Sequence, residues 1–96
     1  MPLFDLSHRR ILVTGSNAGL GFAIARGLAQ HGAGVILNGR NPEKLRAAAD
    51  LLRKEGHTVE EARFDITNED EVRAAAADLS SKRPIDVLIK IGRAHV

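Results

Sequence analysis

Short apolar runs alternate with longer segments of helical periodicity along the chain. The runs at 11–13 and 35–37 are entirely apolar and rich in β-branched residues, which is typical of strands buried on both faces of a parallel sheet. A further, largely apolar run spans 85–89. The run at 57–64 carries polar side chains, and this favours a strand at the edge of the sheet. The pattern therefore predicts four strands.

Between these runs, apolar residues recur every three or four positions and predict three helices. The first is predicted to begin at Leu20 and to stop at Gly32. The second is predicted to begin at Asn41, because Asn caps helices and the following Pro42 suits a first helical turn. Gly56 is predicted to end it.

The third helix is predicted to start with a capping box of Thr67 and Asp70, and a turn at 80–84 follows it. Each helix has residues that are predicted to face the sheet. In chain order these are Leu20, Ile24, Gly27, Leu28 and His31, then Leu45, Ala48, Ala49 and Leu52, then Val72, Ala75, Ala76 and Leu79. Strand–helix alternation predicts right-handed βαβ units and a parallel sheet in the order 3-2-1-4. The expected fold class is α/β, the N-terminal half of a doubly wound Rossmann fold.

The composition argues against several classes of function. The 96 residues include no Cys, so neither a disulfide framework nor a thiolate metal site is available. The four His lack the close spacing of a zinc motif. The net charge of +2 arises from basic residues interleaved with acids, without an aromatic platform, which argues against a nucleic-acid partner. Because no secretory signal or bilayer-spanning run is present, we expect a cytoplasmic protein without a membrane partner.

A glycine-rich turn, TGSNAGLG at 14–21, joins the first predicted strand to the first helix. Gly15 permits a sharp turn, because glycine adopts backbone conformations closed to other residues. Gly19 permits the backbone to approach a pyrophosphate, and Gly21 permits close packing of the helix. The helix N-terminus then offers N–H groups and partial positive charge to phosphates. A tight turn with incidental glycines is the alternative, and the strand–turn–helix context argues against it.

The spacing differs from the G-x-G-x-x-G of ordinary dinucleotide-binding domains and from the phosphate loop of ATPases. Thr-Gly-x-x-x-Gly-x-Gly is instead the signature of the short-chain dehydrogenase/reductase family, which this chain resembles from about residue 4 to residue 89. The resemblance implies a truncated NAD(P)-binding Rossmann domain at 1–89. It also implies which residues line the phosphates and the ribose of the cofactor, namely Gly15, Ser16, Asn17, Gly19, Leu20 and Gly21.

The end of the second predicted strand bears on the choice of cofactor. NAD-preferring sites place an acid there to accept hydrogen bonds from the ribose hydroxyls. Here Gly39 stands where family members that use NAD often carry Asp, and Arg40 can grip a 2′-phosphate through its planar fork of donors. NADP is therefore the predicted cofactor. Many NADP-using relatives carry a second basic residue at the position of Ala18, so NAD use stays open, and a surface pair between Arg40 and Glu43 is the alternative role of the arginine.

Asp65 and Ile66 follow the third predicted strand and match the family position that reads the adenine ring. The resemblance implies that the carboxylate of Asp65 accepts a hydrogen bond from the exocyclic amine while Ile66 covers the ring. A turn Asp that precedes a helix explains the same residue on local chemistry alone.

The family's catalytic residues have no counterpart in this chain. Members use a Tyr, a Lys four residues later, a Ser and an upstream Asn, because a Tyr with its ordinary pKa of about 10 needs help to move a proton at neutral pH. The chain has no Tyr, so we expect it to lack the catalytic step. After residue 89 the family usually continues Asn-Asn-Ala-Gly, whereas this sequence reads KIGRAHV at 90–96. Because the codons of a sequencing adaptor encode Ile-Gly-Arg-Ala-His-Val, we expect residues 90–96 to be a non-native tail.

The resemblance implies that the parent protein is an NADP(H)-dependent oxidoreductase that interconverts a secondary alcohol and a ketone. The segments at 4–7, 37–41 and 64–67 most resemble gluconate 5-dehydrogenases, with 3-oxoacyl carrier-protein reductases as the close alternative. An alternative of another class is a non-catalytic NADP-binding regulatory module. The expected partner is a small alcohol or ketone substrate, and the family usually forms homo-oligomers through its later helices.

Overall fold

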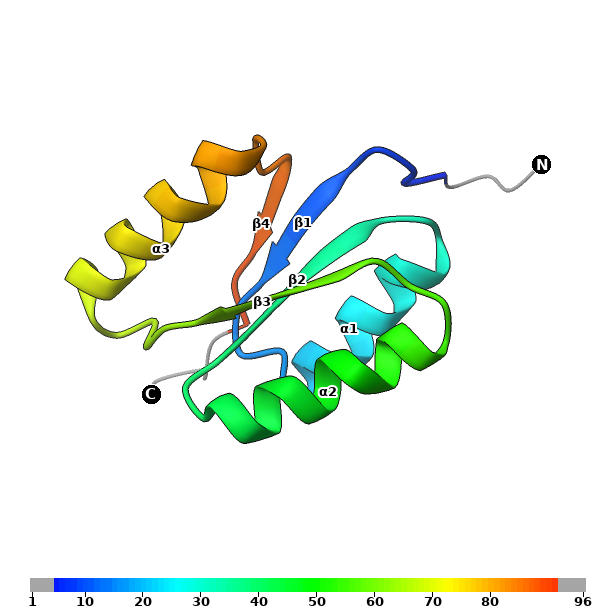
Figure 1. Ribbon diagram of the computed structural model, residues 1–96, viewed down its shortest axis with the longest axis horizontal. Helices are drawn as coiled ribbons and strands as arrows, with labels where there is room; N and C mark the ends of the chain where they lie inside the picture. The colour runs from blue at the N-terminus through cyan, green and yellow to red at the C-terminus, as the bar shows by residue number, and fades with distance from the viewer. Residues whose placement is uncertain (1–4, 92–96) are drawn as a thin grey trace.

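The computed structural model describes residues 5–91. Within them, four strands alternate with three helices (Figure 1). In chain order the elements are β1 (Arg10–Val13), α1 (Gly19–Gln30), β2 (Gly34–Gly39), α2 (Pro42–Lys54), β3 (Val59–Arg63), α3 (Glu69–Lys82) and β4 (Val87–Ile89). Each predicted strand and helix is present, although several begin or end a few residues from the predicted position.

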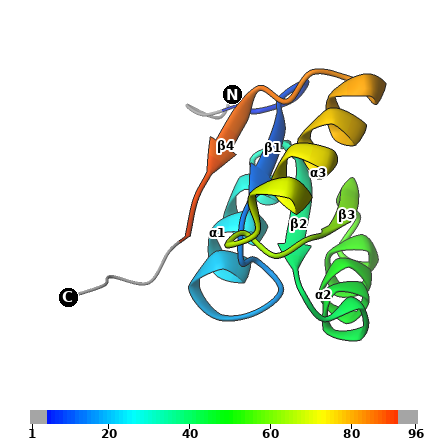
Figure 2. The same ribbon diagram turned by 90° about the vertical axis from the view of Figure 1, so that its left-hand side faces the viewer.

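The four strands form one parallel sheet in the order β3-β2-β1-β4, which confirms the predicted topology and the edge position of the third strand. Helices α1 and α2 cover one face of the sheet and α3 covers the other (Figure 2). Successive side chains of a strand point to opposite faces. Ile11 and Val13 therefore pack with α1 and α2, whereas Leu12 packs with α3.

The second edge of the sheet is formed by β4, whose Val87 and Leu88 side chains are about half exposed. A cleft of about 530 Å³ lies on the α3 side of the sheet and is lined by residues of β1, α3 and β4, including Leu12, Val72 and Leu88. This face of the sheet is thus only partly covered. None of the helices within residues 5–91 has the length and apolar character needed to cross a membrane.

Helix α2 agrees most closely with the prediction from the sequence. The side-chain oxygen of Asn41 accepts hydrogen bonds from the N–H groups of Glu43 at 2.9 Å and Lys44 at 3.1 Å, so Asn41 is the predicted cap. Pro42 is the first helical residue, and all four predicted inward side chains are buried. Gly56 follows the helix with a φ of +91°, a conformation that favours glycine.

The predicted inward face of α1 was wrong at its two ends, Leu20 and His31, whereas Leu28 packs against the core as predicted. The structure buries Gly21, Ala25 and Ala29, whereas Leu20 is 69% exposed. The helix approaches β1 and the preceding turn so closely that small residues occupy the contact. The helix end at Gly32 is confirmed, with a φ of +100°.

Helix α3 also differs from the prediction. Its cap is Asn68, whose side chain accepts a hydrogen bond from an N–H of the first turn at 3.1 Å, so the predicted capping box at Thr67 is wrong. The hydroxyl and N–H of Thr67 are instead engaged by the preceding carboxylate. The helix continues to Lys82, which overturns the predicted turn at 80–84. Ala76 is exposed, although it lines the cleft between α3 and the sheet, on the side that was predicted.

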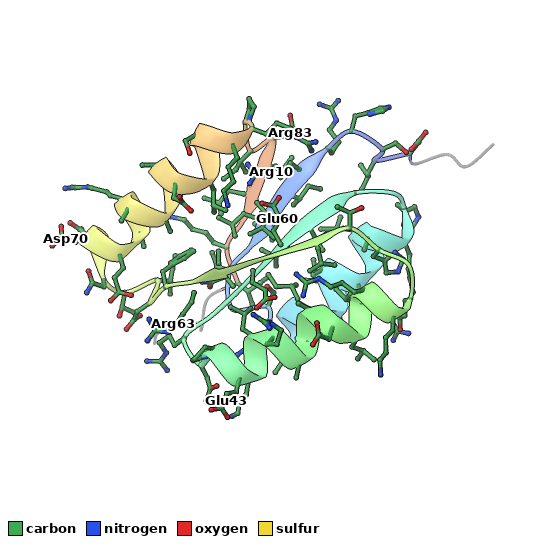
Figure 3. All side chains as sticks on the ribbon, viewed as in Figure 1. Arg10, Glu43, Glu60, Arg63, Asp70 and Arg83 are labelled. Carbon is green, nitrogen blue, oxygen red and sulfur yellow. The ribbon has the colours of Figure 1, made fainter. Side chains whose placement is uncertain are left out.

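Arg10 precedes the predicted start of the first strand at residue 11, yet it is part of β1 and only 2% exposed. Its guanidinium forms a forked ion pair with Glu60 of β3, with N–O distances of 2.7 and 2.6 Å, and donates to the carbonyl oxygens of Leu79 and Arg83 (Figure 3). The N–H of Arg10 donates to the Asp86 carboxylate at 2.7 Å. A buried charge is tolerated only with partners of this kind. The cluster joins β1, β3, α3 and the segment before β4 at the amino edge of the sheet.

Candidate cofactor-binding site

The turn between β1 and α1 leaves the N-terminus of α1 open. Gly15 and Gly19 have φ values of +59° and +60°, so the chain reverses through conformations that favour glycine. Ala18 precedes the helix and provides no side-chain cap, and the first turn of α1 has no acidic residue. By contrast, α2 and α3 are both capped by Asn and carry acids in their first turns. Among the helices of residues 5–91, α1 is therefore the one whose N-terminal N–H groups stay available to an anion.

Gly19 and Gly21 serve different purposes in this turn. A Cβ built on Gly21 would lie 2.3 Å from the carbonyl oxygen of Gly15, so only glycine allows α1 to pack against the turn. A Cβ on Gly19 would meet no atom within 4 Å. The surface above Gly19 is therefore open, as a site for a pyrophosphate needs it to be.

Asn38 of β2 holds the turn in place. Its side-chain oxygen accepts from the N–H of Gly15 at 2.9 Å, and its amide nitrogen donates to the carbonyl oxygens of Ala62 at 3.0 Å and Phe64 at 3.1 Å. One amide thus links the turn to the end of β3. Asn38 was not among the predicted site residues, although a polar residue near the end of an apolar strand is a signal that could have identified it.

Ser16 lies beneath the turn rather than on its surface. Its hydroxyl donates to the carbonyl oxygen of Val13 at 2.6 Å and accepts from the N–H of Asn38 at 2.9 Å. Its own N–H donates to the carbonyl oxygen of Asn38 at 2.8 Å. Because the residue is fully buried, these bonds position the turn from inside the protein.

The side chain of Asn17 covers Gly39 at the end of β2. A Cβ built on Gly39 would lie 2.6 Å from the amide nitrogen of Asn17 and 2.8 Å from its Cγ. The space that a side chain at position 39 would need is therefore filled by a polar group of the turn.

Arg40 follows β2 and is 78% exposed. Its guanidinium lies 3.9 Å from the carboxylate of Asp65, and within residues 5–91 it forms no ion pair with Glu43. The carbonyl oxygen of Arg40 accepts from Nε of Arg63, the last residue of β3, at 3.0 Å. The sequence analysis missed Arg63. Figure 3 shows Arg63 at the same end of the molecule as Glu43, which marks the first turn of α2.

The carboxylate of Asp65 is engaged locally as well. One of its oxygens accepts from the hydroxyl of Thr67 at 2.7 Å and from the N–H of Thr67 at 2.9 Å. These two hydrogen bonds, followed by the positive charge of Arg40, lower the pKa of Asp65 below its ordinary value. The carboxylate is therefore ionised at neutral pH, and its second oxygen faces Arg40.

A model of the family described as short chain dehydrogenase matches residues 9–92 of the chain. The chain belongs to the short-chain dehydrogenase family. The match begins just before β1 and includes every strand and helix described above.

The similar proteins include dehydrogenases that act on gluconate. Gluconate 5-dehydrogenase of Gluconobacter oxydans (strain 621H) is 46% identical over 88 residues, which make up 91% of this chain and 34% of the relative. The solved structure of a gluconate 5-dehydrogenase from Burkholderia cenocepacia J2315 in complex with NADP and tartrate is 42% identical, with a TM-score of 0.83 over 88% of this chain and 34% of that one. This short-chain dehydrogenase chain thus spans about a third of the length of these relatives.

A second group of similar proteins is represented by a 3-oxoacyl (acyl-carrier-protein) reductase from Agrobacterium tumefaciens C58, solved with NADP bound. It is 34% identical, with a TM-score of 0.86 over 98% of this chain and 36% of that one. The two groups share the fold of this chain about equally well, so the fold alone does not separate their activities.

In this short-chain dehydrogenase, the predicted site residues gather at the carboxyl edge of the sheet. The glycine turn, Arg40 and Asp65 each follow the end of a strand there. Leu20 and Ile66 present exposed apolar side chains, which suits contact with a flat ligand. No group of three His, Cys, Asp or Glu within residues 5–91 could hold a metal ion. The predicted tail falls mainly on residues 92–96, which lie outside the described residues.

Proposed function

We propose that this chain is the cofactor-binding part of an NADP(H)-dependent oxidoreductase that interconverts a secondary alcohol and a ketone. The observation that carries the proposal is the open N-terminus of α1, which follows the glycine turn and has no competing cap. A diphosphate at that N-terminus accepts hydrogen bonds from the N–H groups of Gly19, Leu20 and Gly21 and gains from the helix dipole. Asn17, which lies beside Gly39 at the end of β2, is proposed to contact the adenosine ribose.

The preference for NADP rests on the chemistry at the end of β2. Gly39 supplies no carboxylate to accept hydrogen bonds from the 2′-hydroxyl, and the nearest side-chain group there is the amide of Asn17. Arg40 is exposed and adjacent, so its guanidinium is free to turn toward a 2′-phosphate. The NADP bound to the Burkholderia relative supports this preference.

The adenine ring is proposed to lie near Asp65 and Ile66. The carboxylate of Asp65 is ionised and accepts a hydrogen bond from an exocyclic amine, while the exposed side chain of Ile66 covers the ring. Ile66 also lines the cleft on the α3 side of the sheet together with Thr14 and Lys90. An apolar wall with a nearby carboxylate suits a purine.

A sugar acid such as gluconate is the substrate class that the relatives favour. The Gluconobacter relative is a gluconate 5-dehydrogenase, and the Burkholderia structure carries the same name. A 3-oxoacyl carrier-protein substrate is the second candidate, supported by the NADP-bound reductase of Agrobacterium. Both proposals concern the whole protein, of which the chain spans about a third in these relatives.

Binding of NADPH and NADH to the chain tests the proposal, because the two cofactors differ only in the 2′-phosphate and their own fluorescence reports binding as a rise in anisotropy. We expect tighter binding of NADPH. Arg40→Gln removes charge-assisted hydrogen bonds, so it should weaken NADPH binding by roughly tenfold to a hundredfold and leave NADH binding nearly unchanged. Arg46→Gln on the exposed face of α2 is the matched control, since it makes the same change away from the turn. Circular dichroism and sedimentation velocity identify the folded, unassociated chain, and absence of binding of either cofactor to that species would refute the proposal.

A further inference from the structure

A shallow groove of about 350 Å³ lies between the N-terminal end of α1 and the exposed side of α2. Asn17 and Ala18 of the turn line one side of it, and Lys44 and Leu51 of α2 line the other. Asn17 also covers Gly39, which directly precedes Arg40. Asn17 therefore borders both the groove and the end of β2, where a ribose 2′-phosphate would meet the chain.

The charges around this place leave room for another cation. A 2′-phosphate carries about −1.5 to −2 at neutral pH. Arg40 already faces the ionised carboxylate of Asp65 at 3.9 Å, so together the two side chains are close to neutral. Glu43 adds a negative charge in the first turn of α2. A phosphate bound by Arg40 alone would therefore have no excess of positive charge to balance it.

Helix α2 offers this cation through a side chain rather than through its backbone. The N–H groups of Glu43 and Lys44 are occupied by the side-chain oxygen of Asn41. Lys44 is exposed, lines the groove, and forms no ion pair with any residue of the described range 5–91. Lysine binds phosphate as a point charge on a flexible side chain, so Lys44 does not need a fixed side-chain orientation in the shallow groove to attract a phosphate.

We propose that Lys44 is the second cation of the 2′-phosphate site, opposite Arg40, and that it replaces the basic residue which the turn lacks at Ala18. Asn17 lines the groove together with Lys44, and its amide covers Gly39, the residue before Arg40, where it is a neutral donor. The inference rests on the proposed function and assigns to α2 a part in the choice between NADP and NAD.

Arg63 is the competing cation, because its Nε donates to the carbonyl oxygen of Arg40. That hydrogen bond uses one of the N–H donors of the Arg63 guanidinium and fixes the backbone segment between β2 and α2. Arg63 also belongs to the edge strand β3, and it does not line the groove beside Asn17. We therefore expect Arg63 to support the backbone of Arg40 rather than to contact the phosphate.

The test compares Lys44→Gln with Lys54→Gln, the same change in the last turn of the same helix. NADPH and NADH are the probes, and anisotropy of their fluorescence is measured at low and high salt. Lys44→Gln should weaken NADPH binding by about fivefold to tenfold at low salt and leave NADH binding unchanged. Lys44→Arg should retain NADPH affinity, and Lys54→Gln should match the unaltered chain. Lys44 and Lys54 are both exposed, so circular dichroism should show the same fold in all variants.

Other outcomes overturn the inference in distinguishable ways. Equal affinities of Lys44→Gln and Lys54→Gln for NADPH, with Arg40→Gln still impaired, would remove Lys44 and leave the proposed function standing. Equal weakening of NADPH and NADH by Lys44→Gln would show that the lysine does not read the 2′-phosphate. A selective loss of NADPH binding in Arg63→Gln but not in Lys44→Gln would assign the second cation to β3. Failure of the unaltered chain to bind either cofactor refutes the proposed function itself.

Discussion

Replacement of Gly21 by Ala tests how α1 is joined to the glycine turn. The added Cβ would lie 2.3 Å from the carbonyl oxygen of Gly15 and 2.9 Å from both the carbonyl carbon of Gly15 and the Cα of Ser16, inside the 3.0 Å that real Cβ atoms respect. All three atoms belong to the backbone, so the helix or the turn must move. Overpacking of this kind costs about 1–3 kcal/mol, and the better helix propensity of Ala returns about 0.5–1 kcal/mol. We expect a net loss of up to about 2.5 kcal/mol in the free energy of unfolding.

Gly27→Ala is the matched control, because Gly27 lies in the same helix and a Cβ there would meet no atom within 4 Å. It should stabilise the chain by about 0.5–1 kcal/mol through helix propensity alone. Urea unfolding of dilute protein, followed by circular dichroism, measures both changes. If Gly21→Ala raised the urea midpoint as Gly27→Ala does, the close approach of α1 to the turn would be wrong. Loss of NADPH affinity in Gly21→Ala alone would show that the same packing positions the N–H groups of α1.

Three further predictions concern stability and association. Glu60→Gln should cost about 1–2 kcal/mol in urea unfolding at pH 7. Because the hydrogen bond from Arg10 lowers the pKa of Glu60 in the folded state, this cost should persist above the ordinary pKa of 4.5 and shrink as the pH falls through the folded-state pKa. A cost that did not change with pH would contradict the ion pair. Asn41→Ala should cost about 1 kcal/mol in the same assay through loss of the α2 cap, and no cost would refute the cap. The chain should self-associate or remain partly ordered through its exposed β4 edge, and Leu88→Lys should reduce the association seen by sedimentation velocity, whereas a cooperative melt of a concentration-independent monomer would contradict this expectation.

The strand order could be predicted because it depends on features that are local in sequence. Apolar runs, glycine stops and the Asn41 cap each report on a few neighbouring residues, and the handedness of βαβ units restricts how the strands connect. The face of α1 could not be predicted in the same way. Hydrophobicity favoured Leu20 as an inward residue, whereas the close contact with the turn selects Gly21 for its small size. Which neighbour a helix approaches, and how closely, is not encoded in its own periodicity.

Arg10 shows the same limit for charged residues. An arginine next to an apolar run is ordinarily interpreted as the end of a buried segment. Here its partners come from β3, from α3 and from both ends of the segment that joins α3 to β4, at sequence separations of 50 and more residues. The ion pair becomes visible only when the sheet order places β3 and α3 beside the amino end of β1.

The residues of the candidate site also differ in whether local sequence identifies them. The sequence motif of the glycine turn identifies Gly15, Gly19 and Gly21, because each of these glycines is needed by the conformation or packing of the adjacent backbone. Asn17 and Gly39 lie 22 residues apart in sequence. Gly39 matters because it has no side chain, and the amide of Asn17 fills the space that a side chain there would need. An Asp introduced at position 39 would therefore have to displace the Asn17 amide before it could accept a hydrogen bond from a ribose. The choice of cofactor at this edge is consequently a property of two segments in contact, and a change in either one alone also disturbs the other.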